Sequence, residues 1–118
     1  MRFIFTWRDE LVQREKFVDG LRSGVKFTDA ERNEIVKKAV EHRGIETTGI
    51  ICMEEMAELQ QQISKYLRGY GDRLCLLEEM ADVYICLKYI EKVFEIHPNQ
   101  TLKAIDVKLL REKGRLDE

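Results

Sequence analysis

The sequence has few cysteines, histidines and prolines: three, two and one among 118 residues. With so little proline, and no low-complexity segment or linker, the chain is predicted to form a single domain over residues 1–118. The cysteines (Cys52, Cys75 and Cys86) form no CxxC pair and lie within apolar helical patterns. We therefore expect buried thiols in a reducing cytoplasm rather than disulfides or zinc ligands.

The sequence also lacks a long apolar run and an excess of one charge. No stretch approaches the roughly 20 apolar residues of a membrane helix. The apolar residues among 1–7 are too few for a signal peptide, and Arg8 and Asp9 follow them at once. A net charge of −2 predicts no basic surface for nucleic acid or an anionic membrane. We expect a cytoplasmic protein with neither kind of partner.

Apolar residues recur at helical spacing almost throughout, which predicts an all-α fold. Residues 2–7 alternate in a way typical of a short strand or an extended arm. Thr28 and Glu31 form a capping box, so a helix should begin at Asp29, and Gly44 and Gly114 should each end a helix. The turn at residues 69–72 makes its two flanking helices antiparallel neighbours. The predicted helices are 9–21, 29–44, 47–68, 73–96 and 99–113.

Two acidic segments are the most informative feature: EEMAE at 54–58 and EEMAD at 78–82. Carboxylates three residues apart on a helix point the same way, one turn above each other. Four of them from two adjacent helices would form a set of hard oxygen ligands that suits Mg²⁺ or Mn²⁺.

Helical phase selects among these acids at about 100° per residue. On the first helix, Glu55 lies within the apolar stripe and Glu58 at its edge, whereas Glu54 lies off it. On the second helix, Glu79 and Asp82 lie among apolar residues, and phase alone does not exclude Glu78.

Burying carboxylates costs several kcal/mol each, and grouping them adds mutual repulsion, so a divalent cation is the expected compensation. The alternative is two solvated helix faces. With the turn centred between Tyr70 and Gly71, Glu58 and Asp82 would be nearly level across the helix pair. Glu55 and Glu79 would be offset by about 10 Å along the axes, which suits a metal cluster with a phosphate chain better than a single ion.

The pattern Glu-x-x-Glu, about twenty residues, then Glu-x-x-Asp resembles the MazG-like superfamily of all-α nucleoside triphosphate pyrophosphohydrolases. The contexts are EEMAELQQQISKYLRG and LLEEMADVYICL, and the resemblance covers about residues 30–115, leaving 1–27 as an extension of undefined role. It implies a metal-bearing helical hairpin in a four-helix-bundle-like core of a homodimer or homotetramer. It also implies hydrolysis of a (deoxy)nucleoside triphosphate to the monophosphate and pyrophosphate, in nucleotide-pool control or house-cleaning.

The resemblance carries over to particular residues. The implied ligands of Mg²⁺, or of Mn²⁺ in its place, are Glu55, Glu58, Glu79 and Asp82. Glu55 or Glu58 would also act in catalysis by orienting the attacking water as a base. The implied phosphate-binding residues are Lys65, Lys108 and Arg115.

Other functions remain open from the sequence. Phosphoribosyl-ATP pyrophosphohydrolase activity uses the same kind of fold, and a non-enzymatic helical interaction module would use the acids to bind a basic partner. A carboxylate-bridged di-iron bundle needs a glutamate three residues before a histidine. Ala39 and Phe94 occupy those positions before His42 and His97, so the sequence argues against this class. The helix over 74–94 is apolar on nearly every side, which predicts homo-oligomers independently of the resemblance. The base and sugar of the substrate are not encoded in any recognisable pattern.

Overall fold

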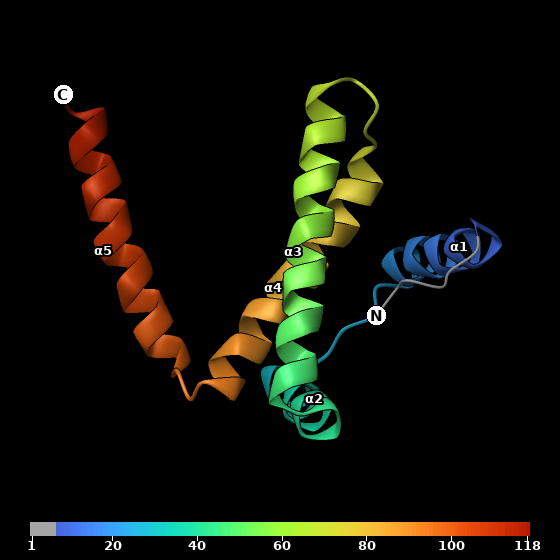
Figure 1. Cartoon of the computed structure of the whole chain (residues 1–118), viewed down its shortest axis with the longest axis horizontal. Helices are drawn as coiled ribbons and strands as arrows, with labels where there is room; N and C mark the ends of the chain where they lie inside the picture. The colour runs from blue at the N-terminus through green and yellow to red at the C-terminus, as the bar shows by residue number, and fades with distance from the viewer. Residues whose placement is uncertain (1–6) are drawn as a thin grey trace.

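Over residues 7–118, which the computed structural model describes with side chains from residue 11 onward, the chain forms five α-helices and no strand (Figure 1). The predicted all-α class is confirmed. The helices are α1 Trp7–Ser23, α2 Asp29–Arg43, α3 Ile45–Leu67, α4 Arg73–Val93 and α5 Pro98–Leu116.

The start of α2 follows the predicted capping box. The backbone N–H of Glu31 donates to Thr28 Oγ1 at 3.1 Å, and the Thr28 N–H donates to Glu31 Oε1 at 2.9 Å. At the other end, the Gly44 N–H donates to the Val40 carbonyl, and Gly44 adopts a φ of 82° that favours glycine. Because Gly44 ends α2 and also caps α3, α3 begins at Ile45, earlier than predicted.

Other predicted helix boundaries also differ from the structure. Trp7 belongs to α1 and not to a strand or arm, while residues 2–6 of that prediction lie outside the described range. Helix α4 ends at Val93, before Glu95 with its φ of 55°, and not at residue 96. Gly114 does not end α5, which continues to Leu116, because a glycine inside a helix costs only about 1 kcal/mol.

Helices α3 and α4 pack against each other as an antiparallel hairpin (Figure 1). In the turn between them, Gly69 adopts a φ of 83°, and the N–H groups of Tyr70 and Gly71 both donate to the Lys65 carbonyl. A Cβ atom on Gly71 would lie 2.5 Å from Tyr66 Cα. The turn therefore folds back over the last turn of α3, and glycine is required at Gly71.

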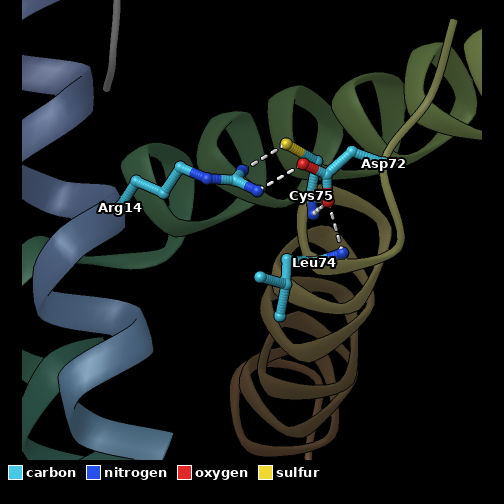
Figure 2. Close-up of polar contacts among 4 residues, drawn as sticks. All are labelled: Arg14, Asp72, Leu74 and Cys75. Atoms are coloured by element: carbon cyan, nitrogen blue, oxygen red, sulfur yellow. Dashed lines mark hydrogen bonds and ion pairs between the residues drawn. The ribbon is translucent and has the colours of Figure 1, made fainter.

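The two N-terminal helices attach to this hairpin at different points. Helix α2 packs against α4 and α3, and the Arg43 guanidinium lies 5.9 Å above the Tyr89 ring. From α1, Arg14 donates to Cys75 Sγ and pairs with Asp72 Oδ2, both at 2.5 Å (Figure 2). Asp72 also caps α4 by accepting from the Leu74 N–H, so one carboxylate anchors α1 and starts α4.

Among the residues with described side chains, the buried positions lie on the facing sides of α3 and α4. They are Thr48 and Cys52 on α3, and Glu79 and Cys86 on α4. Helix α5 leaves the end of α4 and diverges from the hairpin (Figure 1). None of the helices described here is long and apolar enough to cross a membrane.

Candidate metal centre

Three carboxylates meet between α3 and α4. Glu55, Glu58 and Glu79 each present an oxygen, and these oxygens all lie within 4.8 Å of one another. Glu79 is buried, with 8% of its surface exposed, and Glu55 and Glu58 are half-buried. The Oε2 atoms of Glu55 and Glu79 are shielded from solvent. The hairpin thus groups three of the four acids that the sequence singled out as ligands.

The folded-back turn determines which acids face each other. Because Gly71 lies against Tyr66, residues of α3 lie level with residues of α4 that are equally far from residues 68–69. The sequence had suggested a midpoint between residues 70 and 71. Counted from residues 68–69, Glu58 and Glu79 are equally distant from the turn, and Glu55 and Asp82 face each other about one helical turn further on. The expected offset of about 10 Å between Glu55 and Glu79 is wrong, since their carboxylates fall within the same 4.8 Å cluster.

Asp82 lies beside this cluster rather than within it. It is half-buried, and its charge acts together with that of Glu55 on Cys86. Burial, contact with Cys52 and these two carboxylates raise the pKa of the Cys86 thiol to about 12. Glu55 and Asp82 therefore both lie near Cys86, as the revised register requires.

A pair of thiols forms the next layer of the hairpin. Cys52 Sγ donates to the Cys86 carbonyl oxygen at 3.6 Å, and both residues are buried. The prediction of buried free thiols is confirmed for these two and wrong for Cys75, which is half-buried and accepts from Arg14. The sequence did carry a signal for the pair, because Cys52 precedes Glu55 by one turn and Cys86 follows Asp82 by one turn.

The remaining acids of the two segments lie outside the three-carboxylate cluster. Glu54 is half-buried and is not among the three, in agreement with its helical phase. Glu78 is also half-buried, and the cluster contains Glu79 instead. Phase alone did not distinguish these two neighbours on α4.

The basic residues assigned to phosphate binding lie on two different helices. Lys65 is exposed in the last turn of α3. Lys108 and Arg115 are exposed on α5, the helix that diverges from the hairpin (Figure 1). Arg115 pairs with Glu112 at 3.2 Å. Only Lys65 shares a helix with members of the cluster.

A separate open depression of about 470 Å³ runs along α1. Two basic and two acidic side chains line it, so its charge is balanced and indicates no preference for a charged ligand. Its lining residues are Leu11, Arg14, Glu15, Val18, Asp19 and Arg22.

The fold and the site define an all-α protein with a three-carboxylate cluster on a helical hairpin. Neither a protein-family model, nor a characterised protein, nor a solved structure matches the chain significantly. The resemblance to MazG-like enzymes therefore rests on the two acidic segments of the sequence.

Proposed function

We propose that the chain is a metal-dependent nucleoside triphosphate pyrophosphohydrolase of the MazG-like type. The observation that supports this proposal is the grouping of Glu55, Glu58 and Glu79 within 4.8 Å on a hairpin. Three carboxylates this close repel one another, and a divalent cation bound by their oxygens relieves that repulsion. Oxygen ligands alone favour Mg²⁺ or Mn²⁺ over softer metals.

The proposed chemistry assigns a role to each acid. Glu55, Glu58 and Glu79 would hold the ion, with Asp82 completing the set from the neighbouring level of the hairpin. When bound, Mg²⁺ would neutralise charge on the α- and β-phosphates and lower the pKa of a coordinated water. Glu55 or Glu58 orients the attacking water and accepts its proton. The water oxygen bonds to the α-phosphorus, the bond to the bridging oxygen breaks, and pyrophosphate leaves.

The proposal assigns phosphate binding to basic residues of α3 and α5. Lys65 is the basic candidate on the hairpin itself, while Lys108 and Arg115 lie on α5. A higher KM with unchanged kcat in Lys65→Ala would indicate that Lys65 binds the substrate, whereas unchanged kinetics would indicate that it does not.

Release of pyrophosphate tests the proposed activity. Purified protein is incubated with Mg²⁺ and a panel of standard and damaged (deoxy)nucleoside triphosphates, with phosphoribosyl-ATP added to cover that related activity. We expect release from at least one triphosphate. No release from any of them, together with no effect of divalent metal on stability, would instead favour a non-enzymatic helical module.

Matched variants connect the activity to the cluster. Glu58→Gln and Asp82→Asn should each abolish turnover while keeping or raising thermal stability in metal-free buffer, because each removes a negative charge from a crowded site. Glu54→Gln is the control, since it makes the same change on the same helix outside the cluster. A marked loss of stability in the first two variants would indicate structural ion pairs instead.

Exposed apolar surface supports the proposed homodimer or homotetramer. The chain exposes 9811 Å², against about 6,700 Å² expected for a compact monomer of its mass. Its radius of gyration of 16.7 Å likewise exceeds the roughly 13.5 Å of a compact domain of this length. On α4, exposed apolar residues recur at alternating spacings of three and four on the side away from Cys86, which is the pattern of a helix-to-helix seam. These residues are Leu77, Met80, Tyr84 and Leu87. Two hairpins joined along this α4 seam would form a four-helix-bundle-like core.

A further inference from the structure

Helix α5 carries an apolar seam that nothing in the described chain covers. Its members recur at spacings of three, four and seven residues and are 46–76% exposed: Leu102, Ile105, Leu109 and Leu116. This narrow stripe is the pattern that packs against one other helix rather than against a broad core. A helix of this length and ordinary composition is only marginally stable alone in water, so α5 needs a partner.

The junction between α4 and α5 directs α5 away from its own hairpin. The Glu91 side chain accepts from Thr101, which is the main cause of its lowered pKa, and it also pairs with Lys88 at 3.2 Å. His97 caps α5 by accepting from the Asn99 N–H at 3.1 Å, and the His97 N–H donates to the Gln100 side chain. Of these contacts, the one between Glu91 and Thr101 joins α4 to α5, and α5 diverges from the hairpin (Figure 1).

A second uncovered seam runs along α3 and matches α5 in kind. Its exposed members, 37–81% accessible, again alternate at spacings of three and four, with Gln60 between them, in a stripe centred about 60° around the helix from the buried Cys52: Met53, Met56, Ile63 and Leu67. The α4 seam is a different surface on the other helix of the hairpin. Pairing two chains through α4 would therefore leave the α3 seam uncovered.

The charge of α5 favours a contact with another part of a second copy over a contact with a second α5. Helix α5 has five basic and two acidic residues, whereas the rest of the chain has fifteen basic and twenty acidic residues. An α5–α5 contact between two chains would bring like charges together. The exposed area also suffices, because the chain exposes about 3,000 Å² more accessible surface than a compact monomer, while a standard interface buries about 800 Å² on each partner.

We propose that α5 is an exchanged arm that packs its seam against the α3 seam of a second copy of this chain. The exchange is reciprocal, so each copy both donates and receives an α5. It rests on the homo-oligomer part of the proposed function and not on the catalytic activity.

Cross-linking between two differently tagged variants locates the contact. Met53→Cys and Leu109→Cys are introduced into separate chains that also carry Cys75→Ser, and the refolded mixture is treated with a short bis-maleimide. We expect a covalent dimer containing one chain of each kind. Val107→Cys replaces Leu109→Cys in the control, since Val107 is equally exposed on α5 but lies off the seam, and it should give no product above background.

Three outcomes would overturn the exchange. Leu109→Cys alone forming covalent dimers would indicate an α5–α5 contact. A double variant carries Met53→Cys and Leu109→Cys in one chain. If it forms a cross-link only within that chain, α5 folds back on its own hairpin. Equal yields from Val107→Cys and Leu109→Cys would remove the seam from the contact. Tyr84→Cys in a separate sample reports on the α4 seam, so failure of the arm exchange is distinguishable from failure of oligomerisation.

Hydrogen exchange gives an independent readout. Amides of α5 should be protected in concentrated samples and lose protection on dilution, because an undocked α5 frays. Leu109→Glu should remove this protection, and Val107→Glu should leave it. Protection that is independent of concentration would contradict docking on a second copy.

Discussion

At the scale of single residues, the most buried positions between α3 and α4 carry polar groups and thiols at successive levels of the hairpin. Glu58 faces Glu79, Glu55 faces Asp82, and Cys52 faces Cys86. Thr48 continues this series, and its buried Oγ1 has no hydrogen-bond partner among the described residues. Polar groups in such positions usually cost stability, so their accumulation along one seam indicates a role other than holding the fold together.

The first residue-scale prediction concerns the cost of crowding three carboxylates. Two unit charges 4.8 Å apart repel by about 3 kcal/mol at an effective dielectric of about 20, and solvent screening at half-buried positions reduces this to the order of 1 kcal/mol. Glu79→Gln should therefore raise Tm in metal-free buffer by about 3–5 °C. The same variant should lose the rise in Tm that Mg²⁺ or Mn²⁺ produces in the native chain.

The control for Glu79→Gln is the same substitution at a glutamate outside the cluster. Glu54→Gln should keep the metal-dependent rise in Tm, because Glu54 does not belong to the three. If Glu79→Gln lowers stability without metal, or keeps the full response to metal, the prediction is contradicted. The three carboxylates would then be stabilised by ion pairs and would not need a bound cation. Differential scanning fluorimetry with and without chelator measures both effects.

The second residue-scale prediction concerns the thiols. Burial and neighbouring Cys52, Glu55 and Asp82 raise the pKa of Cys86 from 9.0 to about 12, so its reactive thiolate is scarce near neutrality. Ellman's reagent at pH 8 should modify Cys75 in the native protein and all three free thiols only after unfolding. Cys75→Ser should remove the native reaction, and rapid modification of Cys86 in that variant would contradict the buried pair.

The same pKa shift predicts how stability changes with pH. In the unfolded chain Cys86 loses its proton near pH 9, whereas in the folded chain it keeps it until about pH 12. The folded state thus binds more protons over this interval, and its stability should fall as pH rises from about 9 to 12. Cys86→Ala should flatten that fall, as measured by urea unfolding at several alkaline pH values.

At the scale of elements, the turn between α3 and α4 sets the alignment of the site. Gly71 packs against the backbone of Tyr66, and this close approach shifts the midpoint of the hairpin toward α3. The shift brings Glu58 level with Glu79. A turn that projected beyond the helix ends would separate the carboxylates of Glu55 and Glu79 by about two helical turns.

Two glycine variants test this role of the turn. Gly71→Ala should destabilise the protein by about 2 kcal/mol or more and weaken its response to Mg²⁺, because the added Cβ meets Tyr66 backbone and moves the turn. Gly49→Ala on α3 is the control, since nothing lies within 4 Å of its Cβ position, and it should stabilise the helix by up to about 1 kcal/mol. Urea unfolding with and without Mg²⁺ separates the two effects, and a Gly71→Ala variant with unchanged metal response would contradict the link between turn and site.

These elements show what could be predicted from the sequence. Thr28 and Glu31 predict the start of α2 because a capping box is a local signal, and helical phase separates Glu54 from Glu55 because the direction of a side chain follows the helical period. The alignment of the two helices could not be predicted, since it depends on Gly71 folding onto Tyr66, a tertiary contact. The direction of α5 was equally hidden, because it depends on Glu91 accepting from Thr101 across the α4–α5 junction.

At the scale of the whole molecule, the chain exposes more surface than a compact monomer of its mass, and many of its large apolar side chains lie in that surface. The buried positions belong to the α3–α4 interface, whereas the outer seams of α3, α4 and α5 are exposed. A hairpin with so small a core gains little stability from its own packing. Association should therefore contribute much of the folding free energy, and the proposed metal site should form fully only in the assembled protein.

The whole-molecule prediction follows from the α4 seam. Tyr84→Glu should convert the oligomer to a smaller species and lower Tm, because it places a charge among Leu77, Met80 and Leu87 where two hairpins are expected to meet. Tyr70→Glu is the matched control, because Tyr70 is 78% exposed, compared with 68% for Tyr84. Tyr70 lies in the turn, away from the seam, so the mass of the assembled protein should not change in this variant. Light scattering coupled to size-exclusion chromatography gives the mass, and thermal unfolding across a range of protein concentrations gives the coupling of assembly to stability. A native chain that is monomeric at every concentration, with a Tm independent of concentration, would contradict both the α4 pairing and the contribution of assembly to the fold.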